Sequence, residues 1–292
     1  MGMDNKKLLF DKIYSDVFSH LNKPNIDIFL CGGASTSEKK SFRDVLRKEL
    51  KLIDKINVLY PEELFMEILN RKHYNLLQLE ELLAENCDYI VIVSESPGSY
   101  AELGAFANNE NTMKKTIVLS QTKFKNVRSF IKQGPIQHIE DYDKKHVIYY
   151  NETNKEKCID DLLKAIRIHN RNGIIYNYNK NKKDIDLISG HYNYIMLLLY
   201  FFVDLEIIDV KNTVKEIFIS KGFPSKSFEV VYQSAIRRLF SDGQICKHKE
   251  NDNSKYKLSS KGYHTACSLI DSIRIDKKSY ALNRIRLDII DK

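Results

Sequence analysis

The chain of 292 residues lacks the cysteine and histidine spacings on which metal centres and disulfide frameworks are built. Its five cysteines form no C-x-x-C pair, and the nearest two, Cys246 and Cys267, stand 21 positions apart. Its eight histidines show neither H-E-x-x-H nor another ligand spacing. Most zinc sites and disulfide scaffolds are therefore excluded, and we expect free thiols, no metal and no resident cofactor.

Long apolar segments are also missing. The longest apolar run covers the ten residues 194–203, whereas a helix needs about 20 residues to cross a bilayer. The first residues, MGMDNKKLLFDKI, lack the apolar core and the small-residue cleavage site of a signal peptide. We expect a protein of a reducing, bacterial-type cytoplasm without a membrane partner.

The common nucleotide-binding loops are absent as well, because neither G-x-G-x-x-G nor G-K-[ST] occurs. The composition is that of a globular protein, with 43% hydrophobic and 29% charged residues. Because the length exceeds a typical single domain, we expect two packed units.

Charge is divided unevenly along the chain. Residues 1–150 hold 21 Lys and Arg against 21 Asp and Glu, and residues 151–292 hold 25 against 18. The whole excess of +7 therefore lies in the second half, which suits a polyanion such as a nucleic acid. A solubilising surface bias explains the same numbers, and this alternative stays open.

Residues 1–150 alternate buried-strand patterns with amphipathic helix patterns, which is typical of an open parallel α/β sheet. Strands are predicted at 26–33, at 56–60 before Pro61, at 88–96 and at 116–120, and helices at 39–53, 76–86 and 99–113. Such sheets bind ligands at the carboxyl ends of their strands. Three segments are therefore expected to converge on one site: residues 31–34, 60–63 and 94–99.

The second half has a different pattern. Residues 151–190 are expected to form a helical connector, with a helix at 155–170 and a linker around 172–190 that is rich in Asn and Lys. Residues 191–292 predict a winged helix-turn-helix domain. Its expected elements are helices at 191–208, 211–220, 228–243 and 262–275 and two short strands around the NDNS loop.

The segment ESPGSYAELGAFANNEN, residues 95–111, is the most distinctive local feature. Pro97 and Gly98 turn the chain at the end of a buried strand, and Ser99 is expected to cap the helix that follows. Glu102 would then lie near the mouth of the crevice, where a carboxylate can stabilise or attack a positively charged sugar carbon. The alternative is a capping box, because Ser99 and Glu102 have the S-x-x-E spacing.

The stretch PGSYAELGAFA (97–107), together with CGG (31–33) at the end of the first strand, resembles the nucleoside 2-deoxyribosyltransferase family. In that family a glutamate followed by a glycine carries the nucleophile, and Glu102 followed by Gly104 matches this E-x-G arrangement. The chain departs from the family at 95–97, where Glu-Ser-Pro replaces an aspartate of the turn.

Nearly the whole chain is similar to effectors of bacterial retrons of the deoxyribosyltransferase-like type. The similarity rests on the blocks FLCGG, NVLYPEELF, LLQLEELLAENCDYIVIVSESPGSYAELGAFANNEN and KFKNVRSFIKQGP, followed by the winged helix. It implies an antiphage toxin that cleaves the N-glycosidic bond of NAD+, with NAD+ as substrate. It also implies control by the retron reverse transcriptase and its msDNA with the attached RNA, in a homo-oligomer or a higher-order assembly. Base release or transfer on nucleosides or nucleotides, and a non-catalytic DNA-bound nucleotide sensor, remain as alternatives.

The candidate residues fall into three groups. Glu102 is the catalytic candidate. The substrate-binding candidates are Cys31, Gly32, Gly33, Glu62, Ser96, Gly98, Ser99 and Asn109. The nucleic-acid-binding candidates are Arg237, Arg238, Lys247, Lys249, Lys255 and Lys257. For the second domain, a surface used only for protein docking stays an alternative.

Overall fold

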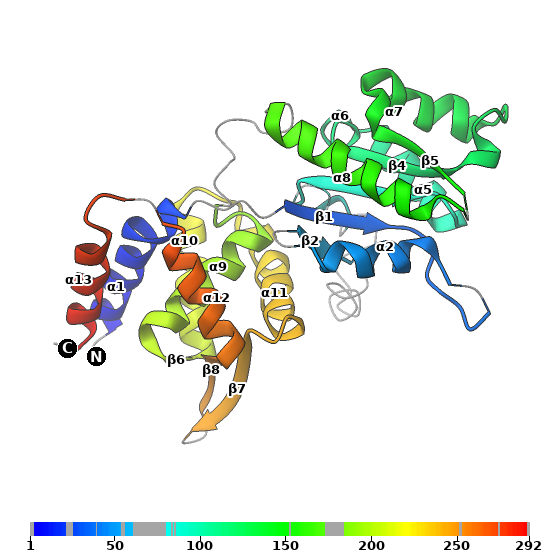
Figure 1. Ribbon diagram of the computed structural model, residues 1–292. Coiled ribbons are helices and arrows are strands. Elements are labelled where there is room, and N and C mark those ends of the chain that lie inside the picture. Colours follow the sequence, from blue (N-terminus) through cyan, green and yellow to red (C-terminus); the bar gives the residue numbers. More distant parts are fainter. Residues whose placement is uncertain are drawn as a thin grey trace. The chain divides into compact units, whose positions relative to one another are not determined.

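The computed structural model describes residues 3–21, 26–38, 40–53, 56–60, 80–82, 84, 86–151, 153–172, 184–250, 253–273 and 275–290. Its contacts divide the chain into two compact units (Figure 1). One unit is continuous and contains residues 24–178, and the other combines residues 1–23 with residues 179–292.

The continuous unit is an α/β unit built on five strands. The strands are β1 (Ile26–Cys31), β2 (Ile56–Leu59), β3 (Tyr89–Val93), β4 (Thr116–Gln121) and β5 (Val147–Tyr150). Its longer helices are α2 (Phe42–Lys51), α5 (Pro97–Ala107) and α8 (Lys155–Asn172), with the short helices α6 (Glu110–Met113) and α7 (Gln137–Tyr142) between them. A π-helical turn, η3, covers Lys132–Ile136 and leads into α7.

All neighbouring strands pair in parallel, in the order β2-β1-β3-β4-β5. The predicted open parallel sheet is therefore confirmed. This strand order is that of a doubly wound sheet, in which the chain runs outward in both directions from β1 and β3. The three central strands, β1, β3 and β4, are almost entirely buried, which explains their continuous apolar sequences.

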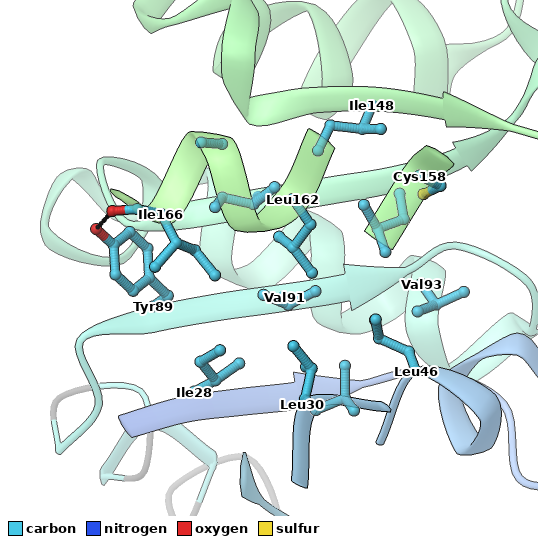
Figure 2. Close-up of a cluster of buried hydrophobic side chains, with 14 of the residues drawn as sticks. Ile28, Leu30, Leu46, Tyr89, Val91, Val93, Ile148, Cys158, Leu162 and Ile166 are labelled. Atoms are coloured by element: carbon cyan, nitrogen blue, oxygen red, sulfur yellow. Dashed lines mark hydrogen bonds between the residues drawn. The ribbon is translucent and has the colours of Figure 1, made fainter. Parts of the chain in front are cut away.

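Helices α2 and α8 share one core with the sheet (Figure 2). From the strands, this core receives Ile28 and Leu30 of β1 and alternate residues of β3, β4 and β5. From α8 it receives Cys158, Leu162, Ala165 and Ile166, spaced as one face of a helix. The hydroxyl of Tyr89 also donates a hydrogen bond of 3.1 Å to the carbonyl of Ile166.

Helix α5 covers the opposite face of the sheet. Phe29 lies between two residues of β1 that face α2 and α8, so its side chain points the other way. It meets Phe106 of α5 edge to face, with ring centroids 5.8 Å apart. The sheet is therefore covered on both faces, as a fully buried parallel sheet requires.

The unit boundaries differ from those drawn on the sequence. The helix expected in a connector is α8, and it belongs to the α/β unit because its apolar face covers the sheet. Strand β5 was not predicted. The single helix expected at 99–113 is two helices, α5 and α6, because Asn108 ends the first and Asn109 caps the second. The helix expected at 76–86 falls largely outside the described residues.

The second unit is mainly helical. Its helices are α1 (Met3–Asp16), α9 (Ile188–Phe202), α10 (Ile207–Ser220), α11 (Ser225–Ser241), α12 (Ser260–Asp271) and α13 (Lys278–Ile290). Its strands β6 (Asp204–Glu206), β7 (Ile245–Glu250) and β8 (Asn253–Leu258) form an antiparallel sheet in the order β6-β8-β7. Helix α9 ends earlier than expected, because Val203 has a φ of 61° and β6 follows it.

Helix α1 was not predicted, and it packs with the last third of the chain. The ring of Phe10 meets that of Phe202 at 5.1 Å, and the hydroxyl of Tyr194 donates to the carbonyl of Phe10 at 2.9 Å. Tyr14 contributes a further hydrogen bond of 2.7 Å to Asp184. These contacts explain why residues 1–23 belong to the second unit. None of the described helices is both long and apolar enough to cross a bilayer.

Candidate functional site

The carboxyl ends of β1 and β3 lie side by side at the centre of the sheet, because the two strands are paired directly. After β1 the chain continues towards α2 and β2, whereas after β3 it continues towards α5 and β4. The loops of the two strands therefore separate at this point, which is where doubly wound sheets bind ligands. The predicted loops, residues 31–34 and 94–99, follow these two strands.

The two glycines after β1 allow a close approach of the loops. Gly32 has a φ of +153°, and a Cβ at this position would lie 2.9 Å from Cβ of Arg43. A Cβ on Gly33 would lie 3.2 Å from Cβ of Ser96, in the loop after β3. Any larger residue would separate these segments, so the glycines serve loop packing at the candidate site.

Glu95 joins the loop after β3 to the start of α2. Its carboxylate accepts hydrogen bonds from the backbone N–H groups of Phe42 (3.0 Å) and Arg43 (3.2 Å). These are the first two residues of α2, whose N-cap is Ser41. A carboxylate is favoured at this place by the partial positive charge of the helix N-terminus. The amide groups at the start of α2 are thus already bound to an anion of the protein.

Ser96, and not Ser99, is the N-cap of α5, so the predicted cap is wrong by three residues. The Ser96 hydroxyl accepts a hydrogen bond from the N–H of Ser99 at 3.2 Å, and the Ser99 hydroxyl accepts one from the N–H of Ser96 at 3.0 Å. Pro97 fits the first helical position, because it has no N–H group to satisfy there. The capping box is therefore Ser96–Ser99, and the alternative box between Ser99 and Glu102 is wrong.

This cap changes what the start of α5 offers to a ligand. Pro97 lacks an N–H, and the N–H of Ser99 is bound to Ser96. In the first turn, Gly98 therefore has an N–H group that the cap does not use. The side chain of Ser99 is buried and holds the turn. The start of α5 thus offers a ligand fewer N–H donors than the sequence suggested.

Glu102 lies in the second turn of α5, beyond the residues that form the cap. Its neighbours Leu103 and Phe106 are buried, whereas Ala101 and Ala105 are exposed. Glu102 itself is half-buried, and its Oε2 atom is shielded from solvent. A carboxylate in this position is partly exposed and partly desolvated, and in such an environment its charge acts strongly.

The other candidate residues of this unit have separate positions. Cys31 is the last residue of β1 and is buried. The side chain of Asn109 accepts from the N–H of Asn111 and caps α6, so Asn109 lies beyond the end of the helix that carries Glu102. Glu62 lies outside the described residues.

The sequence interpretation missed a network beside the loop after β1. Asp44 accepts hydrogen bonds from the backbone N–H of Ser35 (3.0 Å), from its hydroxyl and from the hydroxyl of Tyr60 (3.0 Å). Burial raises the pKa of Asp44, but these hydrogen bonds outweigh it and lower the pKa to about 2. The guanidinium groups of Arg43 and Arg47 lie 4.6 and 4.1 Å from the centre of the Tyr60 ring.

A sequence signal for this network exists. Helix α2 follows β1 directly, so residues in its first turns lie near the carboxyl edge of the sheet. The charged residues Arg43, Asp44 and Arg47 occupy those turns, and Tyr60 directly follows β2. The network fixes the loop after β1 against the ends of α2 and β2.

The candidate basic residues of the second unit fall into different environments. Arg238 is packed: its side chain is 10% exposed, it pairs with Asp242 at 3.6 Å and it lies 4.9 Å from the Tyr192 ring centre. Arg237 is half-buried on α11. The four lysines lie on β7 and β8, where Lys247, Lys249 and Lys257 are exposed and Lys255 is half-buried.

Among the described residues, Asp204, His248 and Glu250 have possible metal-ligand atoms within 4.8 Å of one another. The ammonium group of Lys255 lies 3.4 Å from Asp204 and 2.5 Å from Glu250. A cation of the protein therefore already balances both carboxylates of this group.

Comparisons with known proteins identify the family of this chain. The family model described as "STM3845 retron effector protein" matches residues 39–251. The chain is 29% identical over 303 aligned positions to the "Retron Ec86 putative ribosyltransferase/DNA-binding protein" of Escherichia coli, covering 98% of this chain and 94% of that protein. It is 32% identical over 140 positions to the "Retron Ec73 putative ribosyltransferase/DNA-binding protein" of Escherichia coli, covering 46% of this chain and 44% of that protein. The chain therefore belongs to the STM3845 retron effector protein family.

Proposed function

We propose that this retron effector is an antiphage toxin that cleaves the N-glycosidic bond of NAD+ and releases nicotinamide. Glu102 is the catalytic residue of this proposal. The observation that supports it is that Glu102 lies in the second turn of α5, the helix that follows β3, while the cap of this helix is supplied by Ser96 and Ser99. The carboxylate is therefore not needed for the cap.

Cleavage of the bond to nicotinamide requires little beyond a negative charge close to C1′ of the ribose. The bond between C1′ of the ribose and the nicotinamide nitrogen breaks, and its electron pair stays on the nitrogen, which becomes neutral. The positive charge moves to the ribose as an oxocarbenium ion, which Glu102 stabilises. Water then attacks C1′ and loses a proton, giving ADP-ribose and nicotinamide. Because the leaving group is already cationic, no strong general acid is needed.

The loops after β1 and β3 support a role in binding the ribose. Gly33 and Ser96 pack against each other, and the Gly98 N–H remains as a donor at the start of α5. A single donor suits a sugar hydroxyl better than a doubly charged phosphate group. In this proposal Gly32 and Gly33 shape the loop against which the nucleotide lies.

The second unit has the element order of a winged helix-turn-helix, and we include this assignment in the proposal. Helices α10 and α11 form the helix pair, and β7 and β8 form the wing. The relatives in Escherichia coli are named DNA-binding proteins, which supports a nucleic-acid partner. The proposed partners are the retron reverse transcriptase and its msDNA with the attached RNA. They hold the effector in a cytoplasmic assembly, either a homo-oligomer or a higher-order complex.

A second candidate is base exchange or base release on nucleosides or nucleotides. The word ribosyltransferase in the names of the relatives favours it. The same oxocarbenium ion forms, but a second base captures it in place of water in the exchange reaction. A non-catalytic nucleotide sensor is the third alternative, and it predicts ligand binding without either product.

The test uses the full chain, alone and assembled with the reverse transcriptase and msDNA, incubated with NAD+. Free nicotinamide is followed by chromatography. We expect Glu102→Gln to lower the rate at least about 100-fold, the effect typical of lost transition-state charge stabilisation. The matched control is Glu110→Gln, which makes the same change at an exposed position of α6 and should retain the rate.

Separate outcomes distinguish the candidates. Release of free purine or pyrimidine from nucleosides, with NAD+ left intact, would favour the second candidate. Absence of nicotinamide release from both the isolated wild-type chain and the assembled wild-type complex would contradict the proposal. Equal rates of nicotinamide release by wild type and Glu102→Gln would show that Glu102 is not the catalytic residue.

A further inference from the structure

The β7–β8 hairpin places its lysines on two opposite faces. In an antiparallel pair, directly opposed residues share a face, and the face alternates along each strand. Lys247 is opposed by Tyr256 and Lys249 by Ser254, whereas Lys255 is opposed by His248 and Lys257 by Cys246. The four lysines therefore form two pairs on different sides of the same hairpin. Lys247 and Lys249 lie on what we call the inner face, and Lys255 and Lys257 lie on the outer face.

The inner face is the one that turns towards the helices of the same unit. Ile245, Tyr256 and Leu205 lie on it and are buried. The Tyr256 ring meets that of Phe240, near the end of α11, edge to face at 5.7 Å. Figure 1 shows the hairpin projecting away from these helices, so the inner face continues beyond the part that is packed.

On the outer face, acidic and basic side chains lie together. Asp204 and Glu206 of β6 are opposed by Lys257 and Lys255, and Glu250 of β7 lies on this same face. Two lysines thus share this face with three carboxylates. Lys255 forms ion pairs with Asp204 and Glu250, and its hydrogen bond to Glu250 raises the pKa of its ammonium group. A polyanion that approached this face would meet the three carboxylates as well as the lysines.

The inner face carries positive charge alone. Its strand residues are Leu205, Ile245, Lys247, Lys249, Ser254, Tyr256 and Leu258, and none of these is acidic. Lys247 and Lys249 are both exposed, and within the described part of the chain they form no ion pair. They stand two residues apart on one strand, about 7 Å, which corresponds to roughly two nucleotide steps of rise along the axis of a DNA duplex.

We propose that the hairpin binds the phosphate backbone of DNA through its inner face, with Lys247 and Lys249 as the contacts, and that the outer face does not take part. This inference rests on the proposed nucleic-acid role of the second unit. It also separates residues that the sequence had grouped together, because only two of the four hairpin lysines remain contacts.

The test compares two double variants of the full chain that remove the same charge from the same hairpin. The first is Lys247→Gln with Lys249→Gln, and the matched control is Lys255→Gln with Lys257→Gln. Binding of a fluorescein-labelled DNA duplex of ~20 base pairs is measured by anisotropy over a range of salt concentrations. Thermal melting checks that both variants are folded.

We expect the inner-face variant to reduce the slope of log Kd against log salt by about 2, because each lost phosphate contact lowers it by about 1. Its affinity at low salt should fall about tenfold or more. The outer-face variant should retain the wild-type slope. A Lys247→Arg, Lys249→Arg variant should also retain it, since the positive charges are kept.

The remaining outcomes overturn the inference, each in a recognisable way. Equal loss of slope in both double variants, or loss only in the outer-face variant, would show that the hairpin faces are assigned wrongly while DNA binding itself stands. Absence of binding by the wild-type chain, to the duplex and to a single strand of the same sequence, would remove the nucleic-acid role and the inference with it. Neither result would affect the proposed cleavage of NAD+ by Glu102.

Discussion

Removing the Glu95 carboxylate should loosen the start of α2 from the centre of the sheet. The carboxylate accepts two backbone hydrogen bonds, from Phe42 and Arg43, at 3.0 and 3.2 Å. Each lost capping hydrogen bond costs about 1 kcal/mol, so Glu95→Ala should destabilise the α/β unit by about 2 kcal/mol. Glu95→Gln retains one acceptor oxygen and should cost about half as much.

Two measurements test this expectation. The chain has no tryptophan, so urea unfolding is followed by far-ultraviolet circular dichroism, where about 2 kcal/mol corresponds to a midpoint shift of roughly 1 M. Hydrogen exchange of the peptide that covers the start of α2 should also accelerate in Glu95→Ala. Glu49→Gln, at an exposed position of the same helix, is the matched control. Unchanged unfolding and exchange in Glu95→Ala would refute the assignment of Glu95 as the link between β3 and α2.

Two further predictions concern the cores of the units. Leu162→Ala should cost about 2–5 kcal/mol in urea unfolding, because Leu162 of α8 is fully buried against the sheet, whereas an effect below about 0.5 kcal/mol would indicate that α8 is only a connector. Burial lowers the pKa of His191 to about 3, against the smaller influence of the nearby backbone of Leu187 and Ile185, which raises it. In the unfolded chain His191 binds a proton below about pH 6.5, so the stability of the folded state should fall by about 2 kcal/mol between pH 6.5 and pH 5. His191→Phe should remove this part of the pH dependence, and an unchanged pH profile would contradict it.

The sequence predicted the central part of the sheet because burial leaves a strong signal there. Residues 89–93 are all β-branched or aromatic and all buried, and the predicted loops do follow neighbouring strands. Strand β5 has four residues and lies at the edge of the sheet, so its pattern is too short to distinguish it from a loop. The sequence predicted the helix at 155–170 but placed it in a connector, because a helix prediction does not say which surface the apolar face of α8 covers.

The sequence predicted where the candidate site lies, but it did not predict the hydrogen bonds within the site. The spacing from Ser99 to Glu102 suggested a capping box, but Pro97 starts the helix earlier and moves the box to Ser96 and Ser99. The hydrogen bonds of Asp44 with Ser35 and Tyr60 connect residues 9 and 16 positions apart, and a pattern of local spacings does not contain such contacts. The same holds for the lysines of the hairpin, whose division between two faces depends on the strand register.

The discontinuity of the helical unit has a consequence for biosynthesis. Helix α1 leaves the ribosome first, yet its partner α9 is made only after the roughly 155 residues of the α/β unit, about 8–30 s later at ordinary translation rates, and its partner α13 is made later still. During that interval the apolar side chains of Leu9, Ile13 and Val17, buried in the finished protein, have no core to enter. The nascent chain therefore completes its α/β unit before the helical unit can close, and expression of residues 24–178 alone is the natural way to obtain that unit without an unpaired helix.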